Sequence, residues 1–250
     1  MSLLQVTGLV KRFGGLLATD HLDIEVRPGE LHAIIGPNGA GKTTLINQLS
    51  GELAPSAGRI LLDGVDVTQL PVHRRAAMGI ARSYQITSVF QEFSVLQNVM
   101  FAVQAGAGHN FSFWRSALDD ARLRNPAMEA LATAGLADRA ALPVGALGYG
   151  AQRQLEIAMT LAMRPRLLLL DEPMAGMSQH ESRELTALLL RLKGRYGIVL
   201  VEHDMDAIFT LADRISVLVY GRPIACDTPQ RIRADKAVRE AYLGDQEETI

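Results

Sequence analysis

The stretch Gly36-Pro37-Asn38-Gly39-Ala40-Gly41-Lys42-Thr43-Thr44 decides the fold of this 250-residue chain. It matches in full the glycine-rich phosphate loop G-x-x-x-x-G-K-[ST]. Residues 31–35 before it are typical of a buried parallel strand, and the apolar residues after it recur with helical spacing up to Gly51. Strand, glycine loop and helix are the setting that this motif requires. Together they predict an α/β fold that holds nucleotide phosphates.

The residue types of this loop explain how it would hold phosphate. Gly36, Gly39 and Gly41 allow a tight turn and let backbone N–H groups approach an anion closely. These groups and the positive end of the following helix would face the phosphates. Lys42 would supply a mobile charge to the β- and γ-phosphates, and the Thr43 hydroxyl is an expected ligand of Mg²⁺. The loop by itself indicates phosphate binding and not a particular reaction.

The composition narrows the class of protein. A formal net charge of −2 gives no electrostatic case for binding nucleic acid. The single cysteine, Cys226, excludes internal disulfides and suits a reducing compartment. The first residues lack a signal-peptide pattern, and no apolar run approaches the roughly 20 residues that cross a bilayer. We therefore expect a cytosolic protein whose role at a membrane, if it has one, goes through a partner.

The regions on either side of the phosphate loop have strand character. Residues 3–27 predict two strands around the turn Gly14-Gly15, and residues 58–70 predict further strands around Asp63-Gly64. Phe13 lies just before the first turn. It would either stack on an adenine ring or be an ordinary core or edge aromatic, and its spacing favours neither.

Residues 88–163 predict a helical subdomain inserted into the α/β core. The segment 114–136 has helical spacing, with Pro126 expected to open a second helix. A set of apolar residues near its start would form either an exposed patch for a partner or ordinary core packing: Phe90, Phe93, Val95 and Leu96.

A second glycine loop, Leu147-Gly148-Tyr149-Gly150-Ala151-Gln152-Arg153, leads into an apolar helix. A glycine loop at the start of a helix is a potential anion site or simply a helix start. We call residues 147–153 the signature loop.

Polar residues follow two buried strands at the edge where open α/β sheets bind ligands. Asp171 and Glu172 follow the strand 167–170. Asp171 suits a Mg²⁺ ligand, and Glu172 could orient or deprotonate water. His203 follows the strand 198–201 and would share this edge. A hairpin around residues 220–221 and a closing helix over 229–243 complete the prediction.

This ordered set resembles the ATP-binding subunits of ABC transporters over nearly the whole chain. The phosphate loop, the signature loop and residues 167–173 match the motifs of that family, Gln85 matches its Q-loop glutamine and His203 its switch histidine. The resemblance implies the P-loop ABC-ATPase fold, with an antiparallel β subdomain. It implies one domain, in which residues 1–87 and 164–250 form the nucleotide-binding core.

The resemblance also implies roles for single residues. Lys42, Gln85, Glu172 and His203 would be catalytic, and Mg²⁺ would be held by Thr43, Gln85 and Asp171. Phe13 would stack on adenine. ATP would contact the whole phosphate loop, and Gly148, Tyr149 and Gly150 would contact the ATP of an opposite subunit.

A narrower likeness points to importers of branched-chain amino acids. It rests on residues 11–16 and 202–205, on Tyr149 and on the ending 238–244. Related importers of urea, amides or aromatic acids share much of it. The sequence departs from the family pattern at Gly148, where a serine is usual, at Ala151, where a glutamine is usual, and at Ser178, where an aspartate is common.

The implied partners are integral-membrane permease subunits, a second ATPase subunit and, indirectly, a solute-binding protein. The implied location is the cytoplasmic face of the inner membrane. A GTPase would need an Asn-Lys-x-Asp motif, which the sequence lacks. Soluble ABC proteins usually carry two cassettes or a long coiled coil. A nucleotide-binding module that regulates without hydrolysing is the remaining alternative.

Overall fold

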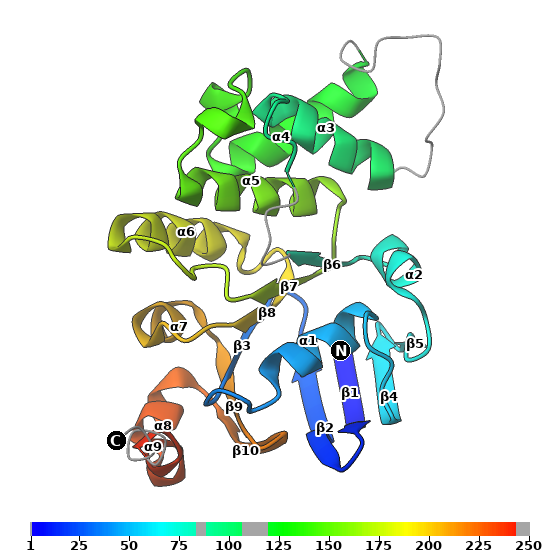
Figure 1. Cartoon of the computed structure of the whole chain (residues 1–250), viewed down its shortest axis with the longest axis vertical. Helices are drawn as coiled ribbons and strands as arrows, with labels where there is room; N and C mark the ends of the chain where they lie inside the picture. Colours follow the sequence, from blue (N-terminus) through cyan, green and yellow to red (C-terminus); the bar gives the residue numbers. More distant parts are fainter. Residues whose placement is uncertain (1, 84–88, 107–119, 244–250) are drawn as a thin grey trace.

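We describe the fold from a computed structural model of the chain, which describes residues 2–83, 89–106 and 120–243. These residues form two sheets with helices packed around them (Figure 1). Among them, no helix is both long and apolar enough to cross a membrane.

The antiparallel sheet has the strand order β2-β1-β4-β5. Its strands alternate between buried apolar and exposed residues, as expected for a sheet with one solvated face. The two predicted strand regions, 3–27 and 58–70, are thereby confirmed. The bounds are β1 Leu4–Phe13, β2 Leu16–Val26, β4 Ala57–Leu62 and β5 Val65–Asp66.

The second sheet is parallel except at one edge and has the order β10-β9-β3-β8-β7-β6. Every residue of β3, β7 and β8 is buried, which is why these strands read as continuous apolar runs. Asp171 pairs with Val201, and Val201 pairs with Ile34, so three strand ends lie in one row. The bounds are β3 Leu31–Ile35, β6 Ile80–Ser83, β7 Leu167–Asp171, β8 Gly197–Val201, β9 Arg214–Val219 and β10 Arg222–Asp227.

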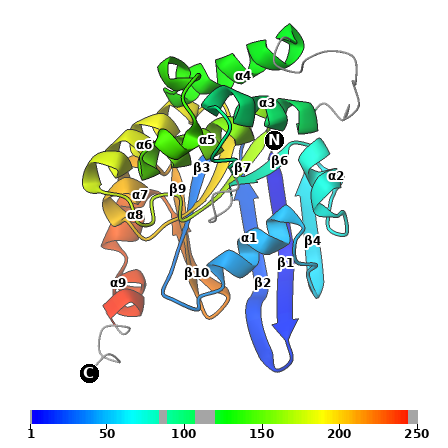
Figure 2. The same ribbon diagram turned by 45° about the horizontal axis from the view of Figure 1, so that its top comes forward.

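The helices cover both faces of the parallel sheet. One hydrophobic core lies between α1, the antiparallel sheet and one face of the parallel sheet. The other core lies between the opposite face of the parallel sheet and the helices α3 through α8. Figure 2 shows α3, α4 and α5 grouped at one end of the molecule. The bounds are α1 Lys42–Ser50, α2 Val72–Ala77, α3 Val95–Gly106, α4 Ala121–Ala134, α5 Tyr149–Ala162, α6 Gln179–Leu192, α7 Met205–Leu211, α8 Pro229–Ala234 and α9 Lys236–Leu243, with short 3₁₀ turns at η2 Ala137–Arg139 and η3 Val144–Ala146.

Two predicted helices differ from the structure. Pro126 lies inside α4 and does not open a helix, because α4 already begins after Asp120, whose side chain caps it by accepting from the N–H of Arg122. The prediction of a single closing helix over residues 229–243 is also wrong. Asp235 has extended backbone geometry after α8, and its carboxylate accepts from the N–H of Ala237 at 2.8 Å, so one residue ends α8 and starts α9.

Candidate functional site

The phosphate loop is tightly held between the two sheets. Gly36 and Gly41 have φ of 154° and 95°. A Cβ at Gly36 would collide with the carbonyl oxygen of Leu218 on β9, and one at Gly41 with that of Ala18 on β2. These two glycines are therefore required by close backbone packing as well as by their dihedral angles.

Lys42 lies over the loop that precedes it. Its Nζ donates to the carbonyl oxygens of Gly36 at 2.7 Å and Pro37 at 2.9 Å. Asn38, Gly39 and Thr43 are exposed, whereas Ala40 is buried in the core beside α1. The lysine charge and the amides at the start of α1, from Gly41 through Thr44, thus belong to one surface that can receive an anion.

Asp171 lies at the end of β7 and is almost fully buried. Its Oδ2 accepts from Arg82 at 3.2 Å, while its Oδ1 makes no hydrogen bond among the described residues. Burial raises the pKa of this carboxyl, and the charge of Arg82 opposes the rise. An orphaned, buried carboxylate oxygen fits a site for a hard cation such as Mg²⁺, which prefers oxygen ligands.

Arg82 is a site residue that the sequence analysis missed. It comes from β6, a strand that we did not predict, and its guanidinium also donates to Asn47 at 2.6 Å and to Glu52 at 2.8 Å. A lone arginine in a four-residue strand carries no sequence signal. Only the pairing of β6 with β7 shows that Arg82 reaches Asp171.

Glu172 leaves the strand in a left-handed conformation, with φ of 48°. Its N–H donates to the carbonyl of Val201 at 2.8 Å, and its carbonyl accepts from Ala175 at 3.1 Å. Its side chain is half-buried, next along the chain to the Asp171 carboxylate. A non-glycine residue held at positive φ is uncommon and is often found where a side chain must be aimed.

The end of β8 carries a buried acid and an exposed histidine. Glu202 accepts from the N–H groups of Met174 at 2.8 Å and His203 at 2.9 Å, so it joins the ends of β7 and β8. Sequence reasoning missed this role of Glu202. The His203 side chain is 70% exposed, and its Nδ1 lies 3.6 Å from the Glu202 carboxylate.

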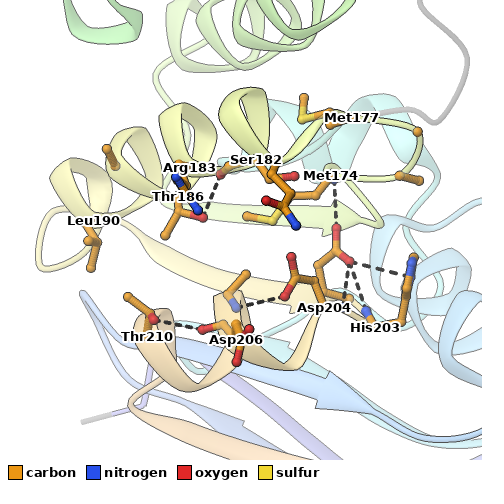
Figure 3. Close-up of a pocket in the computed structure, with 16 residues that line it drawn as sticks. Met174, Met177, Ser182, Arg183, Thr186, Leu190, His203, Asp204, Asp206 and Thr210 are labelled. Carbon is orange, nitrogen blue, oxygen red and sulfur yellow. Dashed lines mark hydrogen bonds and ion pairs between the residues drawn. The ribbon is translucent and has the colours of Figure 1, made fainter.

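A cavity of about 610 Å³ adjoins this histidine. Figure 3 shows α6 on one side of it and α7 on the other. Its walls come from the loop after β7, from α6, from the end of β8 and from α7; they include Met174, Met177, Arg183, His203, Asp204 and Thr210. His203 therefore stands at the junction between the strand-end row and an open surface.

Hydrogen bonds link the signature loop to the loop after β7 and to the start of α6. Tyr149 Oη donates to the carbonyl of Ala175 at 3.1 Å and accepts from Arg153 Nη2 at 2.8 Å. The Gly150 N–H donates to Glu181 Oε1 at 2.8 Å. Gly148 precedes the helix without a side-chain cap.

Two predicted residues remain, Phe13 and Gln85. Phe13 ends β1 at the hairpin tip, 49% exposed, with Lys11 Nζ 5.3 Å from its ring centre, so the core alternative for Phe13 is wrong. Gln85 lies outside the described residues.

The expected apolar patch is partly different from the prediction. Val95 is fully buried and Leu96 packs against the core, so neither belongs to an exposed patch. Phe90, Phe93 and Phe101 are exposed, and their rings meet edge to face at centroid distances of 5.4–5.7 Å. A largely apolar groove of about 300 Å³ adjoins Phe101 and Val89. We call the three rings the phenylalanine cluster.

Comparison with known proteins agrees with this geometry. A family model described as ABC transporter matches residues 19–175, and one described as Branched-chain amino acid ATP-binding cassette transporter matches residues 222–248. The chain is 38% identical to the high-affinity branched-chain amino acid transport ATP-binding protein BraF of Pseudomonas aeruginosa. It is 40% identical to LivG of Escherichia coli K12, which carries the same description. Each match covers 97% of this chain and 98% of the relative.

Solved structures show the same fold. A nucleotide-free ATP-binding cassette from an ABC transporter superposes with a TM-score of 0.84 at 26% identity, covering 97% of this chain and 99% of that one. A cassette of an ABC transporter in its ADP conformation gives a TM-score of 0.85 at 27% identity, covering 98% and 99%. The predicted fold class is thereby confirmed.

Proposed function

This chain belongs to the ABC transporter family of ATP-binding cassettes, and we propose that it hydrolyses ATP to power an importer of branched-chain amino acids. One observation carries the ATPase part of the proposal. The phosphate loop, Asp171-Glu172 and Glu202-His203 follow three adjacent strands, β3, β7 and β8, whose ends lie in one row. The names of the relatives and the match at 222–248 support the solute class.

The phosphate loop would bind the triphosphate tail. Lys42 would leave the Gly36 and Pro37 carbonyls and donate to the β- and γ-phosphates, together with the amides at the start of α1. Thr43, Asp171 and Gln85 are the proposed oxygen ligands for Mg²⁺. When bound, Mg²⁺ would neutralise phosphate charge. Phe13 would stack on the adenine ring.

Glu172 would position the attacking water and accept its proton, since it follows Asp171 at the end of β7 and its backbone is fixed by the hydrogen bond to Val201. His203 would contact the γ-phosphate. Fixed donors stabilise the charge that develops during phosphoryl transfer, and this is the main catalytic term for such enzymes.

A second ATPase subunit would complete each site. We propose that Gly148, Tyr149 and Gly150 contact ATP held by the opposite subunit. Because Gly148 has no hydroxyl, one hydrogen bond to a charged phosphate is lost, worth roughly 1.5–3 kcal/mol. That loss lowers the affinity of the contact by about 10- to 100-fold. The site completed by this signature loop would therefore be the slower one of a heteromeric pair, and Ala151 and Ser178 add to the asymmetry.

The permease would dock on the phenylalanine cluster and its adjoining groove. Three exposed rings beside a largely apolar groove suit the apolar face of a short helix. We propose that residues 88–163 act as a helical subdomain that carries this surface, and that the chain sits peripherally at the cytoplasmic face of the inner membrane. A solute-binding protein would act through the permease.

Reconstitution with co-purified permease subunits tests this proposal. We expect ATP turnover to rise when leucine and its binding protein are added, and Lys42→Ala to abolish turnover with the fold retained. Stimulation only by urea, amides or aromatic acids would move the solute to a related class. Nucleotide binding without turnover, alone and with the permease, would support a regulatory module and reject the ATPase role.

A further inference from the structure

Glu181 joins the start of α5 to the start of α6. Its Oε1 accepts from the Gly150 N–H at 2.8 Å. Its Oε2 accepts from the N–H of Ser178 at 2.9 Å and from the Ser178 hydroxyl at 2.7 Å. One carboxylate thus serves three donors from two loops, and these donors lower the pKa of the Glu181 carboxyl, so the group is charged at neutral pH.

The contact is a packed one. Gly150 lies so close to Glu181 that a Cβ at this glycine would come within 2.7 Å of Glu181 Cγ. A second link runs in parallel, because the Tyr149 hydroxyl donates to Ala175 in the same loop. The first turn of α5 and the loop 175–178 are therefore tied to each other at two points.

The Gly150 N–H belongs to the first turn of α5, where amides have no partner within the helix. In this structure that amide already holds an anion, the Glu181 carboxylate. A phosphate that reaches the same turn meets an occupied donor and a like charge next to it. Two anions cannot share one N–H without repulsion, so one of them must move.

We propose that Glu181 is a positioning residue of the composite ATP site: it holds the Gly150 amide in the separated subunit and yields it when the opposite subunit's γ-phosphate docks. The inference rests on the proposed function, in which the signature loop receives that phosphate. Once displaced from Gly150, the Glu181 carboxylate keeps its hydrogen bonds from Ser178. Docking of the nucleotide thereby breaks one of the two links between α5 and the loop 175–178, and the bond from Tyr149 to Ala175 remains.

Glu181→Gln separates this role from helix capping. Glutamine at this position still completes a capping box with Ser178, so the start of α6 is preserved. An amide has one acceptor oxygen, however, and cannot serve both Ser178 and Gly150. Glu184→Gln is the matched control, because Glu184 lies three residues further along the same helix, is exposed and pairs only with His180 among the described residues.

The experiment measures ATP turnover of the full chain assembled with its permease, with thermal unfolding as the check on folding. We expect Glu181→Gln to lower the KM for ATP by about 3- to 10-fold, the effect of removing one competing charged hydrogen bond at a partly exposed site, with kcat within about twofold. Glu184→Gln should leave both constants unchanged. If Glu181→Gln does not fold, Glu181→Asp, which keeps the charge and loses the reach to Gly150, takes its place with the same expected result.

A KM that is unchanged or higher in the variant, in an assembly whose wild-type form hydrolyses ATP, would overturn the role of Glu181 and leave the proposed function intact. A higher KM would mean that Glu181 builds the phosphate contact and does not compete for it. A wild-type assembly without turnover would instead reject the proposed function itself.

Discussion

The amide of Glu172 donates to the carbonyl of Val201 across 2.8 Å, and this bond joins the ends of two neighbouring strands. It fixes the left-handed backbone of Glu172, whose half-buried side chain comes directly after Asp171 at the end of β7. The same strand end continues into Glu202, which accepts from Met174. The proposed water-positioning group is therefore set by backbone bonds that a side-chain substitution leaves in place.

Glu172→Gln should keep the fold and ATP binding and lower turnover by at least about 100-fold, the usual contribution of a general base. Steady-state ATPase assays with a fluorescent nucleotide-binding assay check this. The control is the same substitution at the matching glutamate of the partner subunit. If the partner's substitution abolishes turnover and Glu172→Gln does not change it, the assignment of the active site to this chain is wrong.

Substitution in the phenylalanine cluster should release the permease. Phe90→Ser or Phe93→Ser removes an exposed ring that no core packing requires, and each should weaken co-purification about tenfold or more, as for a central interface aromatic. Turnover of the chain alone should be unchanged. Ile224→Ser is the control, since Ile224 is similarly exposed on β10, at the opposite edge of the sheet from β6. If Ile224→Ser weakens co-purification with the permease as much as the phenylalanine variants do, the phenylalanine cluster is not a specific docking surface.

Asp171→Asn should stabilise the chain without nucleotide, by about 1 kcal/mol, while impairing Mg²⁺-dependent ATP binding. Because burial raises the pKa of Asp171, this carboxyl stays protonated to a higher pH in the native state than in the unfolded state. The stability of the wild type therefore begins to fall as pH rises past the unfolded-state pKa of about 3.8. The fall is complete once the pH exceeds the raised pKa of the native state. Denaturant unfolding should show the gain at pH 7 and none below about pH 3. A gain that persists at low pH would contradict this origin.

The Cys226 thiol should react as a thiolate near neutral pH. Partial burial acts to raise the pKa of this thiol, but the neighbouring His32, Ser216 and Arg214 lower it to about 7. Arg214 Nη2 lies 3.1 Å from the sulfur. The rate of iodoacetamide alkylation should be half-maximal near pH 7, and Arg214→Leu should move that midpoint upward. A midpoint above pH 8 in the wild type would reject this effect of the neighbouring side chains on the thiol.

Arg75→Met should destabilise the chain by about 3 kcal/mol or more, since it leaves several buried carbonyls without a donor. The buried guanidinium donates to the carbonyls of Gln48 and Leu49 at the end of α1, and to those of Thr68 and Leu70. Arg74→Met is the control, because the Arg74 side chain is exposed. Urea unfolding that shows similar losses for both would contradict this account.

The fold was largely predictable because its decisive segments carry local signals. The loop 36–44 has a fixed glycine pattern, and the buried runs before it and before Asp171 are long enough to recognise. The strand β6 has only four residues, one of them Arg82, so it was missed. Pro126 was misplaced because the start of α4 is set by the cap at Asp120, which competes with the usual preference of proline for a helix start.

The site was only partly predictable. Motif residues such as Lys42 and Asp171 could be identified by spacing, but their neighbours come from distant segments. Arg82 reaches Asp171 across 89 positions, and Glu181 reaches Gly150 across 31. Such contacts depend on strand order and helix packing, which no local pattern encodes.

The way the phosphate loop is attached to the two sheets has one more consequence. The Ala40 carbonyl accepts from Gly221, and the Gly221 carbonyl accepts from Asp20 on β2, so main-chain bonds alone fasten the loop to both sheets. The hairpin that bears Phe13 and the loop that bears Lys42 are consequently joined to each other through the main chain of Gly221. Under the proposed function, nucleotide would enter and leave without any rearrangement between the sheets, and release of spent nucleotide would depend on the opposing subunit moving away.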